Sequence, residues 1–350
     1  DASLWHRLAI AQLQQGKRSE AVDCLEKSLA LDPARTEAHF DLATVFAMLN
    51  RPQEAIAHFE RALTLNPAHA GAHNNLGIVL KSLNRHAEAL AHYEQALALK
   101  PDYAEACNNL GNALQALKRF DEAVQCYERL LKLRPNSPQA CNNLGNALQA
   151  LGRHAEAIPR YQQALALQPD FAQALHNLGN ALASLDRHEE AIDVLQRAIE
   201  LQPHSTRAQF DLGDSLHALD RKSEALAAYD RALAIEPNHP VALNQRGNVL
   251  KALHRYDEAL RCFDAAIAAQ PDFAGAHYNK GNSLVLSNQH ADALKFYERA
   301  IELDPAYAEA HVALGDALFV LQRLEAALRC FEHALALKPS LVMEIGRAHV

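Results

Sequence analysis

Residues 104–136 read AEACNNLGNALQALKRFDEAVQCYERLLKLRPN, and this stretch contains the unit from which the chain is built. Apolar and small residues recur at helical spacing on both sides of Lys118 and Arg119. This pattern predicts two helices of about 13 residues each, joined by a tight turn. Pro135 ends the second helix because proline has no N–H to donate and disfavours helical backbone before it. Asp102 lies three residues before Glu105, so capping-box spacing predicts Asp102 as the N-cap of the first helix.

The same unit recurs every 34 residues along the chain. Ten prolines keep this interval, namely Pro33, Pro67, Pro101, Pro135, Pro169, Pro203, Pro237, Pro271, Pro305 and Pro339. A fixed period of this size indicates one supersecondary unit copied in tandem, so we predict an all-α solenoid of ten helix-turn-helix repeats. The predicted repeats are residues 2–35, 36–69, 70–103, 104–137, 138–171, 172–205, 206–239, 240–273, 274–307 and 308–341.

Small and large residues occupy complementary columns of the repeat. One column holds glycine in eight copies, at Gly77, Gly111, Gly145, Gly179, Gly213, Gly247, Gly281 and Gly315. Glycine inside a helix costs about 1 kcal/mol relative to alanine, so we expect these glycines to let another backbone approach closely. A second column is bulky, with residues such as Tyr127 and Phe263, and we interpret it as core. Pro159 lies inside a predicted second helix, and we expect a local kink there.

This pattern closely resembles the tetratricopeptide (TPR) repeat. The residues at the spacing of that family in the first copy are Trp5, Leu8, Ala9, Ala21, Leu25 and Pro33. The resemblance covers nearly the whole chain and implies helix-turn-helix units stacked into a right-handed superhelix. It also implies a concave groove lined by the first helices.

Asparagine dominates one polar stripe of the first helices. A carboxamide both donates and accepts hydrogen bonds, so a row of them can hold the backbone of an extended peptide. The alternative is that these side chains hold neighbouring helices together. The candidate peptide-binding residues are Asn74, Asn75, Asn108, Asn109, Asn112, Asn142, Asn143, Asn146, Asn177, Asn180, Asn244, Asn248, Tyr278, Asn279 and Asn282.

Composition excludes several function classes. The 350-residue chain has a net charge of -8 and no basic block, which argues against nucleic acid or an acidic membrane surface as partner. Its six cysteines form no C-x-x-C pair, so we expect reduced thiols and a cytoplasmic protein. No nucleotide-binding, nucleophile-elbow or zinc-protease motif occurs, and the 19 histidines recur in packing columns and turns. We therefore predict a non-enzymatic protein with no cofactor and no metal site, whose partner is a protein or peptide.

The end of the chain departs from the repeat. Residues 344–350 read EIGRAHV, which back-translates to a common sequencing adapter, so we expect a non-native read-through tail after a TPR array at 1–343. No polar capping helix follows Pro339, and we expect self-association through the bare last repeat.

Three functions fit these observations. The leading one is a scaffold that holds extended or helical peptide segments in its groove. The alternative is the substrate-recruiting arm of a truncated glycosyltransferase, because the array resembles the TPR region of O-GlcNAc transferases and SPINDLY-like proteins. The segments that carry this likeness are residues 109–114, 143–148 and 177–182. A third possibility is an envelope assembly factor, which a signal peptide upstream of Asp1 would support.

Overall fold

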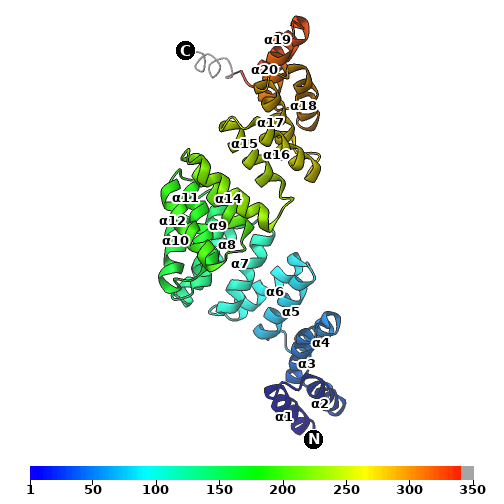
Figure 1. Ribbon diagram of the computed structural model, residues 1–350. Helices are drawn as coiled ribbons and strands as arrows, with labels where there is room; N and C mark the ends of the chain where they lie inside the picture. Colours follow the sequence, from blue (N-terminus) through cyan, green and yellow to red (C-terminus); the bar gives the residue numbers. More distant parts are fainter. Residues whose placement is uncertain (340–350) are drawn as a thin grey trace. The chain divides into compact units, whose positions relative to one another are not determined.

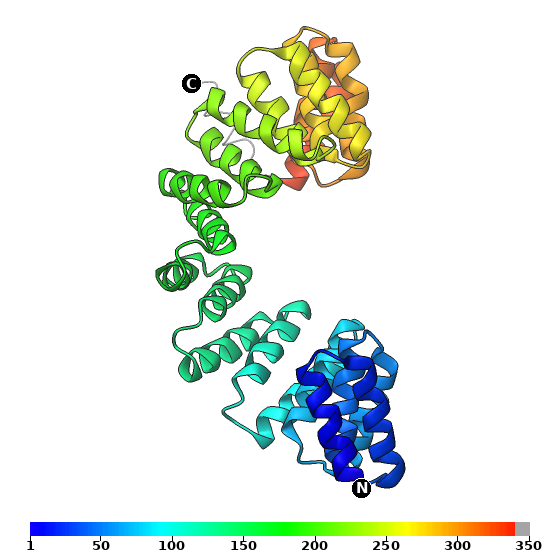
Figure 2. The same cartoon turned by 60° about the horizontal axis from the view of Figure 1, so that its bottom comes forward.

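The computed structural model describes residues 1–339, and within them every regular element is an α-helix (Figure 1). The twenty helices form ten successive pairs, which confirms the predicted all-α solenoid. In Figures 1 and 2 the two helices of a pair run side by side as a hairpin. The predicted tail at 344–350 lies outside the described residues.

The first helices of the pairs are almost uniform in length, as are the second helices. The first helices are α1 (Ala2–Gln14), α3 (Thr36–Met48), α5 (Ala70–Ser82), α7 (Ala104–Ala116), α9 (Pro138–Ala150), α11 (Ala172–Ala183), α13 (Thr206–Ala218), α15 (Pro240–Ala252), α17 (Ala274–Leu286) and α19 (Ala308–Val320). The second helices are α2 (Arg18–Leu31), α4 (Pro52–Leu65), α6 (His86–Leu99), α8 (Phe120–Leu133), α10 (His154–Leu167), α12 (His188–Leu201), α14 (Lys222–Ile235), α16 (Tyr256–Ala269), α18 (His290–Leu303) and α20 (Leu324–Leu337).

Each second helix ends just before its proline. Helix α8 stops at Leu133, two residues before Pro135, and the N–H of Arg134 donates to the carbonyl of Leu130 at 2.7 Å. Proline then prevents the helix from continuing. Helix α10 runs unbroken through Pro159, which lacks the N–H for one backbone hydrogen bond.

The turn inside each repeat contains one residue in the left-handed region. Gly16 and Gly152 occupy it with φ of 76° and 72°, and glycine adopts this backbone without steric cost. In the other repeats a non-glycine residue adopts this left-handed backbone: Asn50, Asn84, Lys118, Asp186, Asp220, His254, Asn288 and Gln322. This conformation reverses the chain so that the second helix packs back on the first.

The prediction of Asp102 as a helix cap is wrong. The N-cap of α7 is Tyr103, with no side-chain hydrogen bond, because Asp102 lies in the turn one residue too early. In the next repeat the hydroxyl of Ser137 caps α9 by accepting from the N–H of Ala140 at 3.2 Å. Serine at this position satisfies one of the free N–H groups at the helix start.

The glycine column faces side chains and not backbone, contrary to our expectation. A Cβ at any of the eight glycines would lie 2.5–2.7 Å from the bulky side chain of the second helix in the same repeat. For Gly145 that neighbour is Cε1 of Tyr161 at 2.5 Å, and the tyrosine is fully buried. The bulky column is therefore core, as predicted, and the missing glycine side chain makes room for it.

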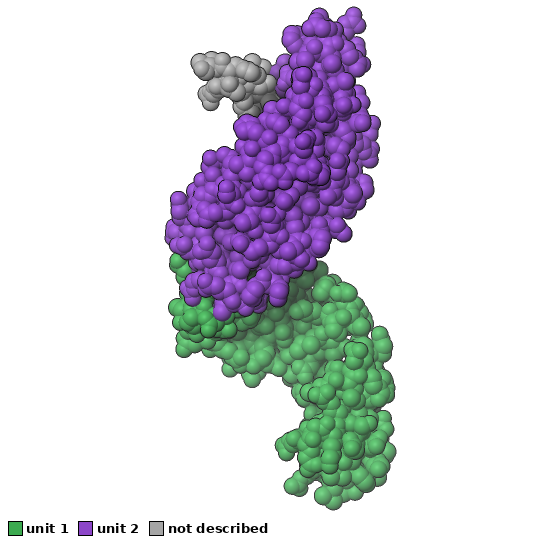
Figure 3. Space-filling model, in the orientation of Figure 1, with its two compact units in different colours: residues 1–177 green, residues 178–350 purple. Residues whose placement is uncertain are grey.

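The chain divides into two compact units, Asp1–Asn177 and Leu178–Val350, of which the second is described to residue 339 (Figure 3). The boundary falls within α11. Each unit continues the same pairing of first and second helices.

Candidate functional site

Asparagines of the first helices hydrogen-bond from one repeat to the next. Asn109 donates from Nδ2 to Oδ1 of Asn74, on the preceding first helix, at 3.0 Å. Two further pairs repeat this contact at 3.0 Å, with Asn177 donating to Asn142 in unit 1 and Asn279 donating to Asn244 in unit 2. These bonds tie neighbouring repeats together and use part of the hydrogen-bonding capacity of the asparagines.

A second asparagine column hydrogen-bonds to the buried tyrosines. The hydroxyl of Tyr127 donates to Oδ1 of Asn112 at 2.7 Å, and Tyr297 does the same to Asn282 at 2.8 Å. In the repeat between residues 138 and 171, Tyr161 reaches Asn146 at 2.9 Å. These bonds satisfy tyrosine hydroxyls that burial would otherwise leave unpaired.

The predicted residues differ in how far they reach solvent. Four of them are buried, namely Asn74, Asn142, Asn143 and Asn244. The others are half-buried: Asn75, Asn108, Asn109, Asn112, Asn146, Asn177, Asn180, Asn248, Tyr278, Asn279 and Asn282. The Tyr278 ring packs against the ring of Tyr307, with centroids 4.9 Å apart. The structure therefore places part of the asparagine row between helices and part of it on the surface.

Four predicted residues meet in one hollow of unit 1. Its volume is about 680 Å³, and it lies over α5 and α7 and the start of α9. The lining residues that the sequence predicted are Asn74, Asn75, Asn108 and Asn109. Those that it missed include Ile78, Tyr103, Glu105, Arg134, Ser137 and Gln139. Ile78 was detectable, because it stands where the next repeat has Asn112.

This hollow, from now on the α5–α7 hollow, carries little net charge, and Ile78 is its most exposed apolar residue. Ile78 is 45% exposed there. The only charges among its lining residues are Glu105 and Arg134, which pair at 2.6 Å. A backbone hydrogen bond, and after it the Arg134 guanidinium, lower the pKa of Glu105. A ligand of the α5–α7 hollow therefore meets carboxamides, the exposed Ile78 and the less exposed Tyr103, with little net charge.

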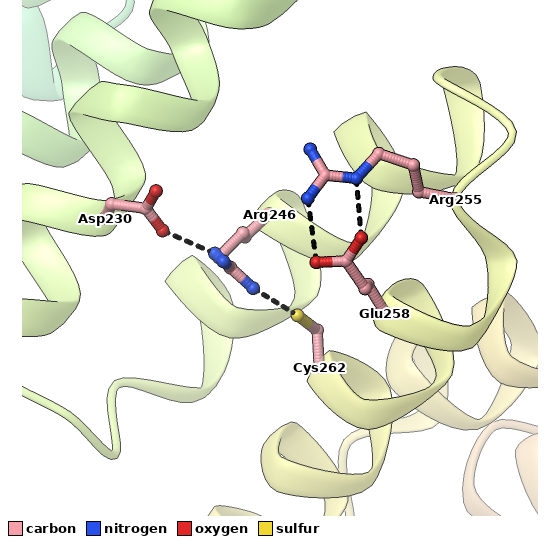
Figure 4. A network of polar contacts seen from close by, with 5 residues as sticks. All are labelled: Asp230, Arg246, Arg255, Glu258 and Cys262. Carbon is pink, nitrogen blue, oxygen red and sulfur yellow. Dashed lines mark hydrogen bonds and ion pairs between the residues drawn. The ribbon is translucent and has the colours of Figure 1, made fainter.

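Within residues 1–339 no group of three or more His, Cys, Asp or Glu side chains is arranged to hold a metal ion. Figure 4 shows the polar network of unit 2 around Cys262, where Arg246 contacts Asp230 at 2.6 Å and the cysteine sulfur at 2.9 Å. Burial raises the pKa of the Cys262 thiol, although Arg246 opposes the shift. The thiol stays protonated at pH 7, so this cysteine is no activated nucleophile.

Comparison with protein families decides the identity of the repeat. Models described as tetratricopeptide repeat match residues 6–72, 142–206 and 244–308, which is more than half of the chain. The chain belongs to the tetratricopeptide repeat family. Further models of the family match residues 58–91, 79–118, 102–170, 186–243 and 284–340, so the matches run without a gap from residue 6 to residue 340.

Solved structures of TPR proteins are similar to parts of the chain. A crystal structure of YrrB, described as a TPR protein with an unusual peptide-binding site, is 28% identical over 53% of this chain and 95% of its own, with a TM-score of 0.47. A MamA structure is 27% identical over 49% of this chain and 93% of its own, with a TM-score of 0.45. PilF of Pseudomonas aeruginosa is 24% identical over 59% of this chain and 95% of its own. Its TM-score of 0.52 supports the fold. No curated protein sequence matches the chain.

No helix within residues 1–339 has both the length and the apolar character needed to cross a membrane.

Proposed function

We propose that this TPR chain is a protein-interaction scaffold that holds an extended, largely uncharged peptide segment in the α5–α7 hollow. The observation that carries the proposal is the meeting of Asn75, Asn108 and Ile78 in one concave site of about 680 Å³. Carboxamides can bond a peptide backbone whatever its side chains are, and Ile78 offers a contact for an apolar residue. The chain needs no catalytic group for this function.

The test is peptide selection followed by a matched pair of substitutions. Peptides selected on the wild-type chain from a random displayed library are measured for affinity by fluorescence anisotropy. Ile78→Asp places a charge in the hollow and should weaken binding by at least tenfold. Leu99→Asp is the control, because Leu99 is 41% exposed on α6 and does not line the hollow. Equal binding by both variants would place the peptide elsewhere, and failure to select any peptide would contradict the scaffold itself.

We also propose that this polypeptide self-associates through the exposed apolar residues of its last described repeat. Leu328 on α20 is 58% exposed, whereas the matching residues Val124 and Ile192 are buried beneath the next first helix. An interface between two copies would bury this apolar side chain as the array buries its counterparts. Sedimentation should show a concentration-dependent mass that Leu328→Lys abolishes, and a monomer at all concentrations would refute this.

A second candidate function is substrate recruitment for a glycosyltransferase domain of a longer polypeptide. The three N-L-G-N-A-L segments at 109–114, 143–148 and 177–182 favour it. Sequencing the source DNA past the codon for Met343 tests it, because a following sugar-nucleotide domain would support this function and a stop codon would not.

The six cysteines are all unpaired, which supports a reducing compartment such as the cytoplasm.

A further inference from the structure

The row of hydrogen bonds between first helices is interrupted at α7. In the regular contact an asparagine donates from Nδ2 to an asparagine of the preceding first helix, as Asn109 does to Asn74 at 3.0 Å. The same spacing of 35 residues would bring Asn143 of α9 to Asn108 of α7. That bond is replaced by one within α9, in which Oδ1 of Asn143 accepts from Nε2 of Gln139 at 2.9 Å.

The interruption leaves the carboxamide of Asn108 unused. Nδ2 of Asn143 lies 3.4 Å from Oδ1 of Asn112 and does not donate to Asn108. Within residues 1–339 neither Oδ1 nor Nδ2 of Asn108 has a hydrogen-bond partner. A half-buried carboxamide with both groups unused has the capacity to bind a ligand.

The other asparagines at this position of the repeat are in a different state. They are Asn74, Asn142 and Asn244, and all three are buried. Each accepts at 3.0 Å from the first helix that follows it. Their oxygens therefore join repeats, whereas the oxygen of Asn108 does not.

Asn108 also differs from the other carboxamides that line the α5–α7 hollow. Asn75 accepts from Asn74 at 3.1 Å, and Asn109 donates to Asn74 at 3.0 Å. Gln139 donates within α9. Each of them spends its oxygen, its nitrogen or both inside the protein, so Asn108 is the carboxamide of this hollow that can offer an acceptor and a donor together.

An acceptor and a donor on one carboxamide match the backbone of an extended peptide. In an extended chain the N–H and the C=O of one residue point to the same side, as they do toward a neighbouring antiparallel strand. Oδ1 of Asn108 can accept from that N–H while its Nδ2 donates to that C=O. We propose that Asn108 is the anchor of the α5–α7 hollow, which holds the backbone of one ligand residue through both hydrogen bonds.

This anchor restricts the ligand to one class of peptide. The residue at Asn108 must carry a free N–H, so proline is excluded from that position. A helical segment is excluded as well, because its interior N–H and C=O groups are bonded to each other. The role of Asn108 rests on the proposed function, since it requires that the α5–α7 hollow binds a peptide.

The test uses the peptide selected on the wild-type chain and a set of versions that each carry one backbone N-methyl group. N-methylation removes one N–H and keeps the side chain. We expect one position where it weakens binding to the wild type by about tenfold or more in fluorescence anisotropy. Asn108→Ala should weaken the unmethylated peptide by about tenfold or more, and methylation at that position should then cost less than about threefold.

Unfolding in urea separates an anchor from a structural asparagine. Asn108→Ala removes no hydrogen bond inside the protein, so its urea midpoint should not fall below that of the wild type. Asn109→Ala is the matched control on the same helix. It loses the bond to Asn74 and should unfold at a lower urea concentration.

Three results would overturn the proposal. If Ile78→Asp weakens binding and Asn108→Ala does not, the α5–α7 hollow binds the peptide without this anchor. If neither substitution weakens binding, the peptide lies elsewhere and the proposed function fails too. An equal loss on N-methylation in the wild type and in Asn108→Ala would show that the peptide N–H does not donate to Asn108.

Discussion

Substitution of Gly145 by alanine tests the packing that joins the two helices of a repeat. The new Cβ would lie 2.5 Å from Cε1 of Tyr161, which is closer than carbon atoms approach. The tyrosine ring cannot easily withdraw, because its hydroxyl is hydrogen-bonded to the side chains of Asn146 and Gln149 at 2.9 and 2.8 Å. Ring and helix must therefore separate, or the hydroxyl must lose its partners.

The magnitude follows from three opposing effects. Overpacking a core costs about 1–3 kcal/mol. The tyrosine hydroxyl has one proton to donate, so losing its hydrogen bond costs about 1 kcal/mol, and alanine returns about 1 kcal/mol of helix propensity. We expect Gly145→Ala to lower the free energy of unfolding by about 2 kcal/mol.

Gly247→Ala is the matched control. It faces Phe263 at 2.6 Å, and this ring has no hydroxyl to hold it in place. It recreates the pairing of Ala43 with Phe59, both of which are fully buried in the second repeat. The ring can shift, so we expect a loss of about 1 kcal/mol or less.

Urea unfolding followed by circular dichroism, fitted with a nearest-neighbour description of the array, measures both changes. The double variant Gly145→Ala/Tyr161→Phe should lose less stability than the sum of its single variants, because the phenylalanine ring is free to move. A Gly145→Ala chain as stable as the wild type, or strict additivity in the double variant, would refute this reasoning.

Two further substitutions test polar groups of the first helices. Burial raises the pKa of Asp214 despite hydrogen bonds from Tyr229 and Gln245, so the folded state loses stability as pH rises from 3.8 through the folded pKa. Asp214→Asn should therefore raise the unfolding free energy by about 1 kcal/mol at pH 7 and by less near pH 4. Urea titrations at both pH values measure this change. A larger gain at pH 4 than at pH 7 would contradict the prediction. Asn177→Ala removes hydrogen bonds to Asn142 and Asn146, of 3.0 and 2.8 Å. It should lower the unfolding free energy by about 2 kcal/mol in the same assay. An unchanged urea midpoint would show that this asparagine does not hold the repeats together.

The sequence predicted the helices well because each signal for them is local. Pro135 and the apolar spacing around Tyr127 determine where α8 ends and which side it buries. The cap of α7 was wrong by one residue because capping depends on turn geometry, and Asp102 and Tyr103 both stand near the helix start. A one-residue difference of this kind depends on backbone angles that residue type does not reveal.

The candidate site was only partly predictable because its contacts are not local. Asn74 and Asn109 belong to the same sequence pattern, yet whether such a side chain reaches solvent depends on a helix about 34 residues away. Asn142 is fully buried for this reason, while Asn108 remains half-buried. The hydrogen bond between His39 and His58 was not predicted because the two residues are 19 positions apart, a spacing that has meaning only once α3 and α4 are folded together.

The left-handed turns leave room for protein engineering. Lys118 and Gln322 adopt φ of 58° and 60°, a backbone that costs a non-glycine residue about 1–2 kcal/mol. Gly16 and Gly152 show that this array accepts glycine at the same point of the repeat. Glycine at these two exposed turns should therefore raise the thermal stability of the chain without altering any residue that lines the α5–α7 hollow.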